Sequence, residues 1–330
     1  MILERAKGQP LTDSKLLGSS TDRRQQLFAD LIAILAQLRG LDFKAAGSLT
    51  PGRVGFFPMP SWLRAFTSPE PIIDSAISMS TNELVQGGCA VSLQPPPTST
   101  SGFIALQHCL LWDIYLLPKQ DLEKTESQYE VFALHTMQQH QLLRQEYENS
   151  QPERFVLTHT DLRGANIMVD DQLRIQTIID WEWAVTVPAA FFTPPFWIMD
   201  SQNMLAEFRH ALASFPSSLE PSVALLQEQW APSDGNELKL HIAQIFLDSY
   251  SLVDVFYKSI YPRLFNVPDK EILCRFFLDP QWQEEIRRRL RSSGRYVQYL
   301  KANNLYVIDE ETQRQKDWIA QGQTLFSTMR

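Results

Sequence analysis

The chain has 330 residues, of which 44% are hydrophobic and 21% are charged, and its formal net charge is −8. This length and composition are typical of a globular protein with a sizeable core, in one large domain or two. The acidic balance argues against nucleic acid and against anionic membrane surfaces as main partners.

The N-terminus and the cysteines indicate a reducing compartment. Residues 1–12 have neither the apolar core nor the cleavage signature of a secretory signal, and the chain has no apolar run long enough to span a membrane. Cys89, Cys109 and Cys274 are widely spaced and lack the spacing of zinc ligands. The predicted location is therefore the cytoplasm.

The first half of the chain is predicted to be helical around a loop-rich insertion. Residues 21–39 have apolar side chains at helical spacing, with Ser20 or Thr21 as the cap and Gly40 as the end. Residues 50–102 are rich in turn formers and predict surface loops, with a short helix near 81–85. Helical periodicity returns from residue 103 to about residue 147.

Residues 155–183 predict a strand, a loop and a hairpin. Apolar runs at 155–157 and 167–169 are typical of short buried strands, and residues 173–179 alternate as a half-buried strand does. The Asp-Asp-Gln turn between the last two closes a hairpin in which Asn166 is expected to pair near Thr177. Asp180 then lies just beyond the hairpin base, at the same end as Asn166.

The polar residues at this end suit phosphoryl transfer. That reaction needs a group that accepts the proton of the attacking hydroxyl, and oxygen ligands that hold magnesium on the nucleotide phosphates. Asp161 has the chemistry for the first task, and Asn166 with Asp180 for the second.

Two other interpretations stay open at this point. An isolated Asp-x-x-x-x-Asn is usually a solvated loop, and a single histidine such as His159 is more often structural than catalytic. The second alternative is an iron site of two histidines and one carboxylate, formed by His159, Asp161 and the distant His210. The segment around His210 is predicted to be helical, and an iron site leaves Asn166 and Asp180 without a role.

The motifs resemble those of a known family. The segments H-T-D-L-R-G-A-N at 159–166 and I-I-D-W-E at 178–182 are similar to the catalytic and metal-binding segments of the aminoglycoside phosphotransferase (APH) family, which has a protein-kinase-like fold. The resemblance implies that Asp161 is the catalytic base, that Asn166 and Asp180 bind Mg²⁺, and that His159 supports the loop. Glu182 is either a supporting contact or structural. Arg163 occupies a position where many members have histidine.

The first residues resemble the family's hinge, the segment that joins its two lobes. By position, the Glu4 carbonyl and the Ala6 N–H would contact adenine. The small β lobe that precedes this hinge in the family is expected to be missing, together with its phosphate-covering loop and strand lysine.

The expected fold is therefore α+β and mainly helical, as the large C-terminal lobe of this fold with a catalytic β-hairpin. A hinge remnant at 1–12 precedes the lobe at 13–330. Within the lobe, residues 13–150 are helices with the insertion, 151–190 hold the catalytic loop and the metal-binding hairpin, and 191–330 form a helical region.

The resemblance implies transfer of the ATP γ-phosphate to a hydroxyl of a small molecule, with Mg²⁺. Without the small lobe, ATP binding is expected to be weak and the chain impaired or inactive. The alternatives are a pseudoenzyme that binds a small molecule or a protein as a scaffold, and a misplaced start inside the hinge. The sequence does not select the acceptor. An exposed hinge surface would favour self-association.

The C-terminal half is predicted to be helical. A buried loop is expected at 183–199, followed by helices near 201–213, 219–230, 236–259 and 281–303. The arginine-rich run at 286–291 follows two glutamates and is predicted to be a solvated helix face rather than a nucleic-acid surface.

Overall fold

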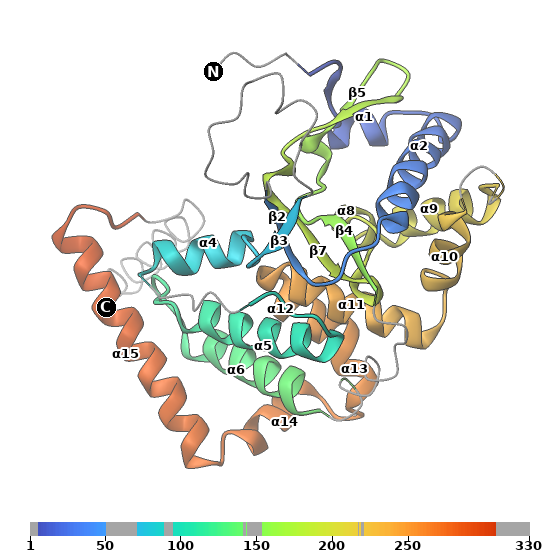
Figure 1. The fold of residues 1–330 in the computed structure, drawn as a ribbon. Coiled ribbons are helices and arrows are strands. Elements are labelled where there is room, and N and C mark those ends of the chain that lie inside the picture. The colour runs from blue at the N-terminus through green and yellow to red at the C-terminus, as the bar shows by residue number, and fades with distance from the viewer. Residues whose placement is uncertain are drawn as a thin grey trace, which may run out of the picture. The chain divides into compact units, whose positions relative to one another are not determined.

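The computed structural model describes residues 6–50, 71–88, 95–140, 143, 154–216, 218 and 221–307. The chain divides into two compact units, one of Met1–Leu117 with Phe132–Ile272 and one of Pro118–Val131 with Leu273–Arg330. Helices dominate, and the described strands form two small antiparallel sheets (Figure 1). The predicted α+β, mainly helical class is confirmed.

The two sheets belong to the first unit. One has the strand order β1-β5-β6 and the other β3-β2-β7-β4, and neighbouring strands are antiparallel. The strands are β1 (Gln9–Pro10), β2 (Gly47–Thr50), β3 (Ile72–Asp74), β4 (Phe155–His159), β5 (Ile167–Val169), β6 (Ile175–Ile178) and β7 (Ala184–Pro188). The strands predicted at 155–157 and 167–169 are confirmed as β4 and β5.

The predicted hairpin of β5 and β6 is present, but its register differs from the expectation. Thr177 lies opposite Met168 and not near Asn166. The Asn166 carbonyl instead accepts a hydrogen bond from the Ile179 N–H at 3.0 Å. The difference arises because Leu173, with a φ of 60°, belongs to the turn, and because a bulge adds a residue to the β6 side.

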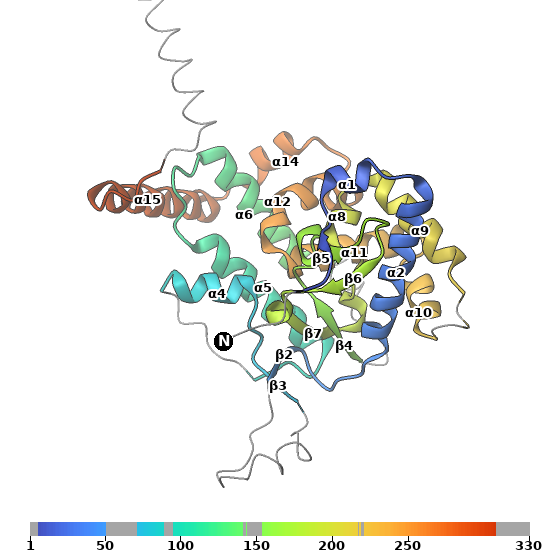
Figure 2. The ribbon, with the colours of Figure 1, turned by 90° about the horizontal axis from the view of Figure 1, so that it is seen from above.

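Helix α2 (Thr21–Gly40) confirms the helix predicted at 21–39. Leu27, Phe28, Leu31 and Ile32 on its apolar face are 0% exposed. This face lies along β4 of one sheet and β6 of the other (Figures 1 and 2). The helix thereby gives the first unit a common core beneath both sheets.

The remaining helices cover much of the described chain. They are α1 (Asp13–Leu17), α4 (Met79–Gln86), α5 (Thr100–Leu116), α6 (Lys124–Gln139), α8 (Phe196–Met199), α9 (Gln202–Ser214), α10 (Ser222–Gln229), α11 (Asp234–Leu247), α12 (Leu252–Val255), α13 (Tyr261–Leu264), α14 (Asp269–Phe276) and α15 (Pro280–Ala302). The helix predicted at 236–259 is too long, because α11 ends before Asp248, whose φ of −130° and ψ of 90° are extended. The helical periodicity predicted from residue 103 corresponds to the two helices α5 and α6, with Pro118 in the connection between them.

The buried loop predicted at 183–199 is wrong. This segment contains β7, which pairs with both β2 and β4 in the four-stranded sheet, and then α8. The alternation of valine and threonine at 185–187 is β-forming, and all three side chains are buried. The prolines that suggested a loop stand after the strand or at its last position.

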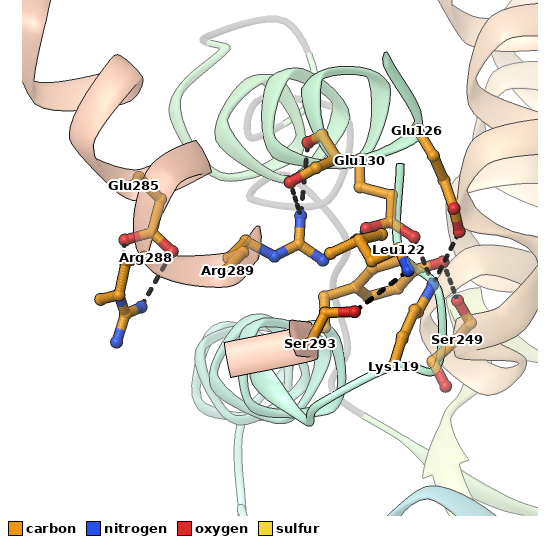
Figure 3. Close-up of polar contacts among 11 residues, drawn as sticks. Lys119, Leu122, Glu126, Glu130, Ser249, Glu285, Arg288, Arg289 and Ser293 are labelled. Atoms are coloured by element: carbon orange, nitrogen blue, oxygen red, sulfur yellow. Dashed lines mark hydrogen bonds and ion pairs between the residues drawn. The ribbon is translucent and has the colours of Figure 1, made fainter. Parts of the chain in front are cut away.

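The second unit corrects the interpretation of the arginine-rich run. Arg288 pairs with Glu285 at 2.8 Å on the exposed side of α15, as a solvated face predicts. The Arg289 side chain is only 5% exposed and instead pairs with Glu130, which is 2% exposed. Figure 3 shows this buried pair beside the exposed one. Arg289 lies on the same side of the helix as the buried Ile286, because the two are three residues apart.

No helix in the described ranges has the length and apolar character needed to cross a membrane.

Candidate active site

Two connections between the sheets form the framework of the site. Residues 160–166 lead from β4 to β5, and residues 179–183 lead from β6 back to β7. Three hydrogen bonds join these connections: His159 Nε2 with the Ile179 carbonyl at 2.9 Å, Thr160 Oγ1 to the Trp183 carbonyl at 2.8 Å, and the Ile179 N–H to the Asn166 carbonyl at 3.0 Å. The predicted residues Asp161, Asn166 and Asp180 therefore lie on two connections that are fixed to each other, and His159 stands at the end of β4 and bonds to one of them.

The Asp161 carboxylate is held in place from both sides. Asn166 Nδ2 donates to the Asp161 backbone carbonyl at 2.8 Å and to Oδ2 at 2.9 Å. Arg163 forms an ion pair with the same Oδ2 at 3.3 Å, and its own side chain is 63% exposed. Oδ1 accepts no hydrogen bond from the described residues. This oxygen is the one left to accept a proton.

Asn166 and Asp180 provide oxygen atoms suited to magnesium. Asn166 is buried and its amide nitrogen is used by Asp161, so its Oδ1 is the atom left for a metal. Asp180 is exposed and has left-handed backbone angles, φ 68° and ψ 42°, which aspartate tolerates better than most residues. Mg²⁺ prefers such hard oxygen ligands and usually takes few from the protein and others from phosphates. The donor chemistry of these two residues therefore fits Mg²⁺.

The iron site considered as an alternative has no support. His210 lies in α9 and is exposed, whereas His159 is buried. In the described part of the chain, no three His, Cys, Asp or Glu side chains gather closely enough to hold a metal ion.

His159 fixes the relation between the two connections. It is 5% exposed, and its ring packs edge-on against Trp181 with centroids 4.9 Å apart. Because a carbonyl oxygen can only accept, Nε2 carries the proton in the bond to Ile179, and Nδ1 is buried without a partner. This bond anchors the residue directly before Asp180. The supporting role predicted for His159 stays a prediction.

Two further contacts support the Asp161 loop and were missed from the sequence. Trp197 Nε1 donates to the Leu162 carbonyl at 3.1 Å. The Leu11 carbonyl lies so close to Gly164 that an added Cβ would be 2.7 Å from it. Gly164 is therefore required because another backbone segment approaches it closely. A glycine within the motif is a sequence signal that could have predicted such a close neighbour. Trp197 could not be found in this way, because its segment was assigned to a loop.

An open pocket borders Asp161. It is open to solvent on one side, and its cavity volume is about 90 Å³. Its walls come from the end of β4, the Asp161 loop, α2, α8 and the end of α11: Leu35, Thr158, His159, Thr160, Asp161, Leu162, Arg163, Thr193, Pro194, Pro195, Phe196, Trp197 and Leu247. A small molecule in this pocket would lie beside the carboxylate.

Ala6 and Glu182, two other residues with predicted contacts, are not among the described residues that line this pocket. Glu4 lies outside the described residues, and Ala6 stands just before the bend that leads into β1. β1 pairs with β5, which directly follows Asn166, so this part of the N-terminus is attached to the site's own hairpin. Glu182 is exposed in the turn at Trp181–Trp183.

A comparison with family models agrees with this arrangement. Residues 1–191, more than half of the chain, match the sequence model of the phosphotransferase enzyme family (APH). A search of the curated proteins found no match. The matched region contains both sheets and the whole Asp161–Asp180 arrangement, and the chain therefore belongs to the phosphotransferase enzyme family.

Proposed function

We propose that this protein transfers the γ-phosphate of ATP to a hydroxyl group of a small molecule. The observation that carries the proposal is the Asp161 carboxylate in the pocket wall, held by Asn166 on a loop joined to the one that carries Asp180. These contacts support a proton acceptor at Asp161 with metal ligands at Asn166 and Asp180 on the two joined loops.

The residues have separate tasks in this proposal. Asp161 Oδ1 accepts a hydrogen bond from the acceptor hydroxyl and takes its proton as the oxygen–phosphorus bond forms. The products are a phosphate ester and ADP. Asn166 Oδ1 and the Asp180 carboxylate hold Mg²⁺, which when bound neutralises charge on the phosphates. The Glu4 carbonyl and the Ala6 N–H are proposed as adenine contacts, on the resemblance to the family hinge.

The test is phosphotransfer from ATP with Mg²⁺ to a panel of small alcohols, followed by ³¹P NMR. Asp161→Asn keeps the shape but removes the base, and it is expected to lower the rate by about 10²- to 10⁴-fold. The matched control is Asp171→Asn, which changes an exposed aspartate in the hairpin turn and is expected to leave the rate unchanged. Equal rates for the two variants would refute the role of Asp161. The sequence-based expectation of weak ATP binding and low turnover stays a prediction that the same assay measures.

One observation favours a second candidate, a protein that binds the small molecule without phosphorylating it. Arg163 forms an ion pair with Oδ2 of the proposed base at 3.3 Å, so the Asp161 carboxylate already has a cationic partner at the position where it would face the acceptor. Under the first proposal, Arg163→His, which restores the residue common in the family, is expected to raise turnover several-fold. If the variant and the unchanged protein both bind acceptor and neither transfers phosphate, the binding function is supported.

A further inference from the structure

The pocket beside Asp161 has a formally neutral wall. Asp161 and Arg163 are the charged side chains among its described lining residues, and they are paired with each other. A cationic ligand would therefore meet one carboxylate, whose Oδ2 already has a guanidinium and an amide as partners and whose Oδ1 is the atom proposed to take the acceptor hydroxyl. Taking an ammonium group out of water without a free counter-charge is unfavourable.

The wall also offers uncharged hydrogen-bonding groups. Thr158 and Thr193 are each 7% exposed, and neither hydroxyl has a hydrogen-bond partner among the described residues. His159 adds an imidazole ring whose Nδ1 is buried without a hydrogen-bond partner. Hydroxyls can both donate and accept, so this set matches the O–H groups of an alcohol without requiring charge.

The rest of the wall is apolar. Phe196, Trp197, Pro194 and Leu247 present carbon surface, and the Trp197 N–H is already used by the Leu162 carbonyl. The Trp197 ring is also fixed by stacking on Phe28, with centroids 6.5 Å apart. Rigid apolar walls of this kind bury the hydrocarbon body of a small ligand.

From this wall, we propose that the acceptor is an uncharged small alcohol or diol with a hydrocarbon or aromatic body, and that the pocket discriminates against amine-bearing and polycationic acceptors. The inference rests on the proposed phosphotransfer and names the substrate class of that site. Thr193 acts as a specificity-determining residue by bonding a hydroxyl of the acceptor.

The experiment compares two probes of equal size, 3-phenylpropane-1,2-diol and its amino counterpart 2-amino-3-phenylpropan-1-ol, with kanamycin as a polycation. Binding to the full chain is measured by calorimetry in the absence of nucleotide. The diol is expected to bind at least tenfold more tightly than the amino alcohol, and kanamycin is expected not to bind. Thr193→Val keeps the shape and is expected to weaken diol binding about three- to tenfold, the effect of one hydrogen bond. Thr136→Val is the control, since Thr136 is equally buried, in α6, and does not line the pocket.

The outcomes separate the two proposals. Tighter binding of the amino alcohol or of kanamycin, absence of diol binding, or equal losses in the two threonine variants would each overturn the inference. Diol binding that depends on Thr193, without any phosphate transfer from ATP, would leave the inference standing and refute the phosphotransfer. Phosphorylation of the amino alcohol in preference to the diol would refute the inference about the acceptor and leave the proposed phosphotransfer standing.

Discussion

Replacing Glu130 tests the buried ion pair of the second unit. Glu130→Gln preserves shape but removes the carboxylate that faces the Arg289 charge, whose neutral contacts include the Ser127 Oγ at 3.1 Å and the Ser127 carbonyl at 3.3 Å. Breaking a buried pair by neutralising one member destabilises a protein by about 3–5 kcal/mol. Lys119, which also contacts Glu130, is 37% exposed and can turn to water. We therefore expect Glu130→Gln to lower the free energy of unfolding by an amount near the lower end of this range, about 3 kcal/mol.

The assay is urea unfolding combined with hydrogen exchange of peptides from α15, which reports the second unit directly. Glu285→Gln is the matched control, because it removes the exposed pair with Arg288 on the same helix and should cost at most about 0.5 kcal/mol. A double change, Glu130→Met with Arg289→Met, removes both charges and is expected to recover most of the loss. The reasoning fails if Glu130→Gln costs no more than Glu285→Gln, or if the double variant is less stable than Glu130→Gln.

Two other predictions, tested with three substitutions, follow from a buried carboxyl group and from the space around two glycines. Burial, together with the nearby Asp200, raises the pKa of Asp248 to about 6. The folded state therefore favours the protonated carboxyl group. The stability that this group contributes below pH 4 is lost as the pH rises to about 6 and above. Asp248→Asn should therefore stabilise the protein at pH 7 by about 1–2 kcal/mol and have no effect below pH 4, as urea unfolding at several pH values would show; equal effects at both pH values would contradict this. Gly164→Ala should cost about 1–3 kcal/mol, because its Cβ would lie 2.7 Å from the Leu11 carbonyl. Gly294→Ala in α15, where an added Cβ meets nothing within 4 Å, should instead stabilise the protein by about 0.5–1 kcal/mol. If thermal unfolding shows that both substitutions change the stability in the same direction, the predicted clash at Gly164 is contradicted.

Local patterns predicted the parts of the fold that local physics determines. Helix α2, β4 and β5 follow from apolar spacing, and the turn before β6 follows from Asp170, whose Oδ1 accepts the N–H groups of Gln172 and Arg174. The predictions that were wrong concern residues whose structure depends on partners distant in the sequence. β7 is a strand because β2 and β4 pair with it. Arg289 is buried because its ion-pair partner, Glu130, lies on another helix.

The same division applies to the site. The spacing from His159 to Asp180 was enough to predict which polar residues gather, because a loop and a hairpin bring them together. The register was two residues off, since neither the bulge nor the positive φ of Leu173 has a clear sequence signal. The wall of the pocket was not predicted, because Thr193 and Trp197 reach it only through the path of the chain after β7.

The strand pairings that frame the site have a consequence for how the protein folds. β1 pairs with β5 some 160 residues later, and Gly47 meets Thr186 across 139 residues. Closing loops of this length is entropically costly and slows folding, in contrast to the rapid formation of local helices. During synthesis, β1 leaves the ribosome long before its partner exists. We expect α2 to form early and the active site to be among the last regions to assemble, so that the nascent chain spends much of its synthesis with an unpaired N-terminal strand.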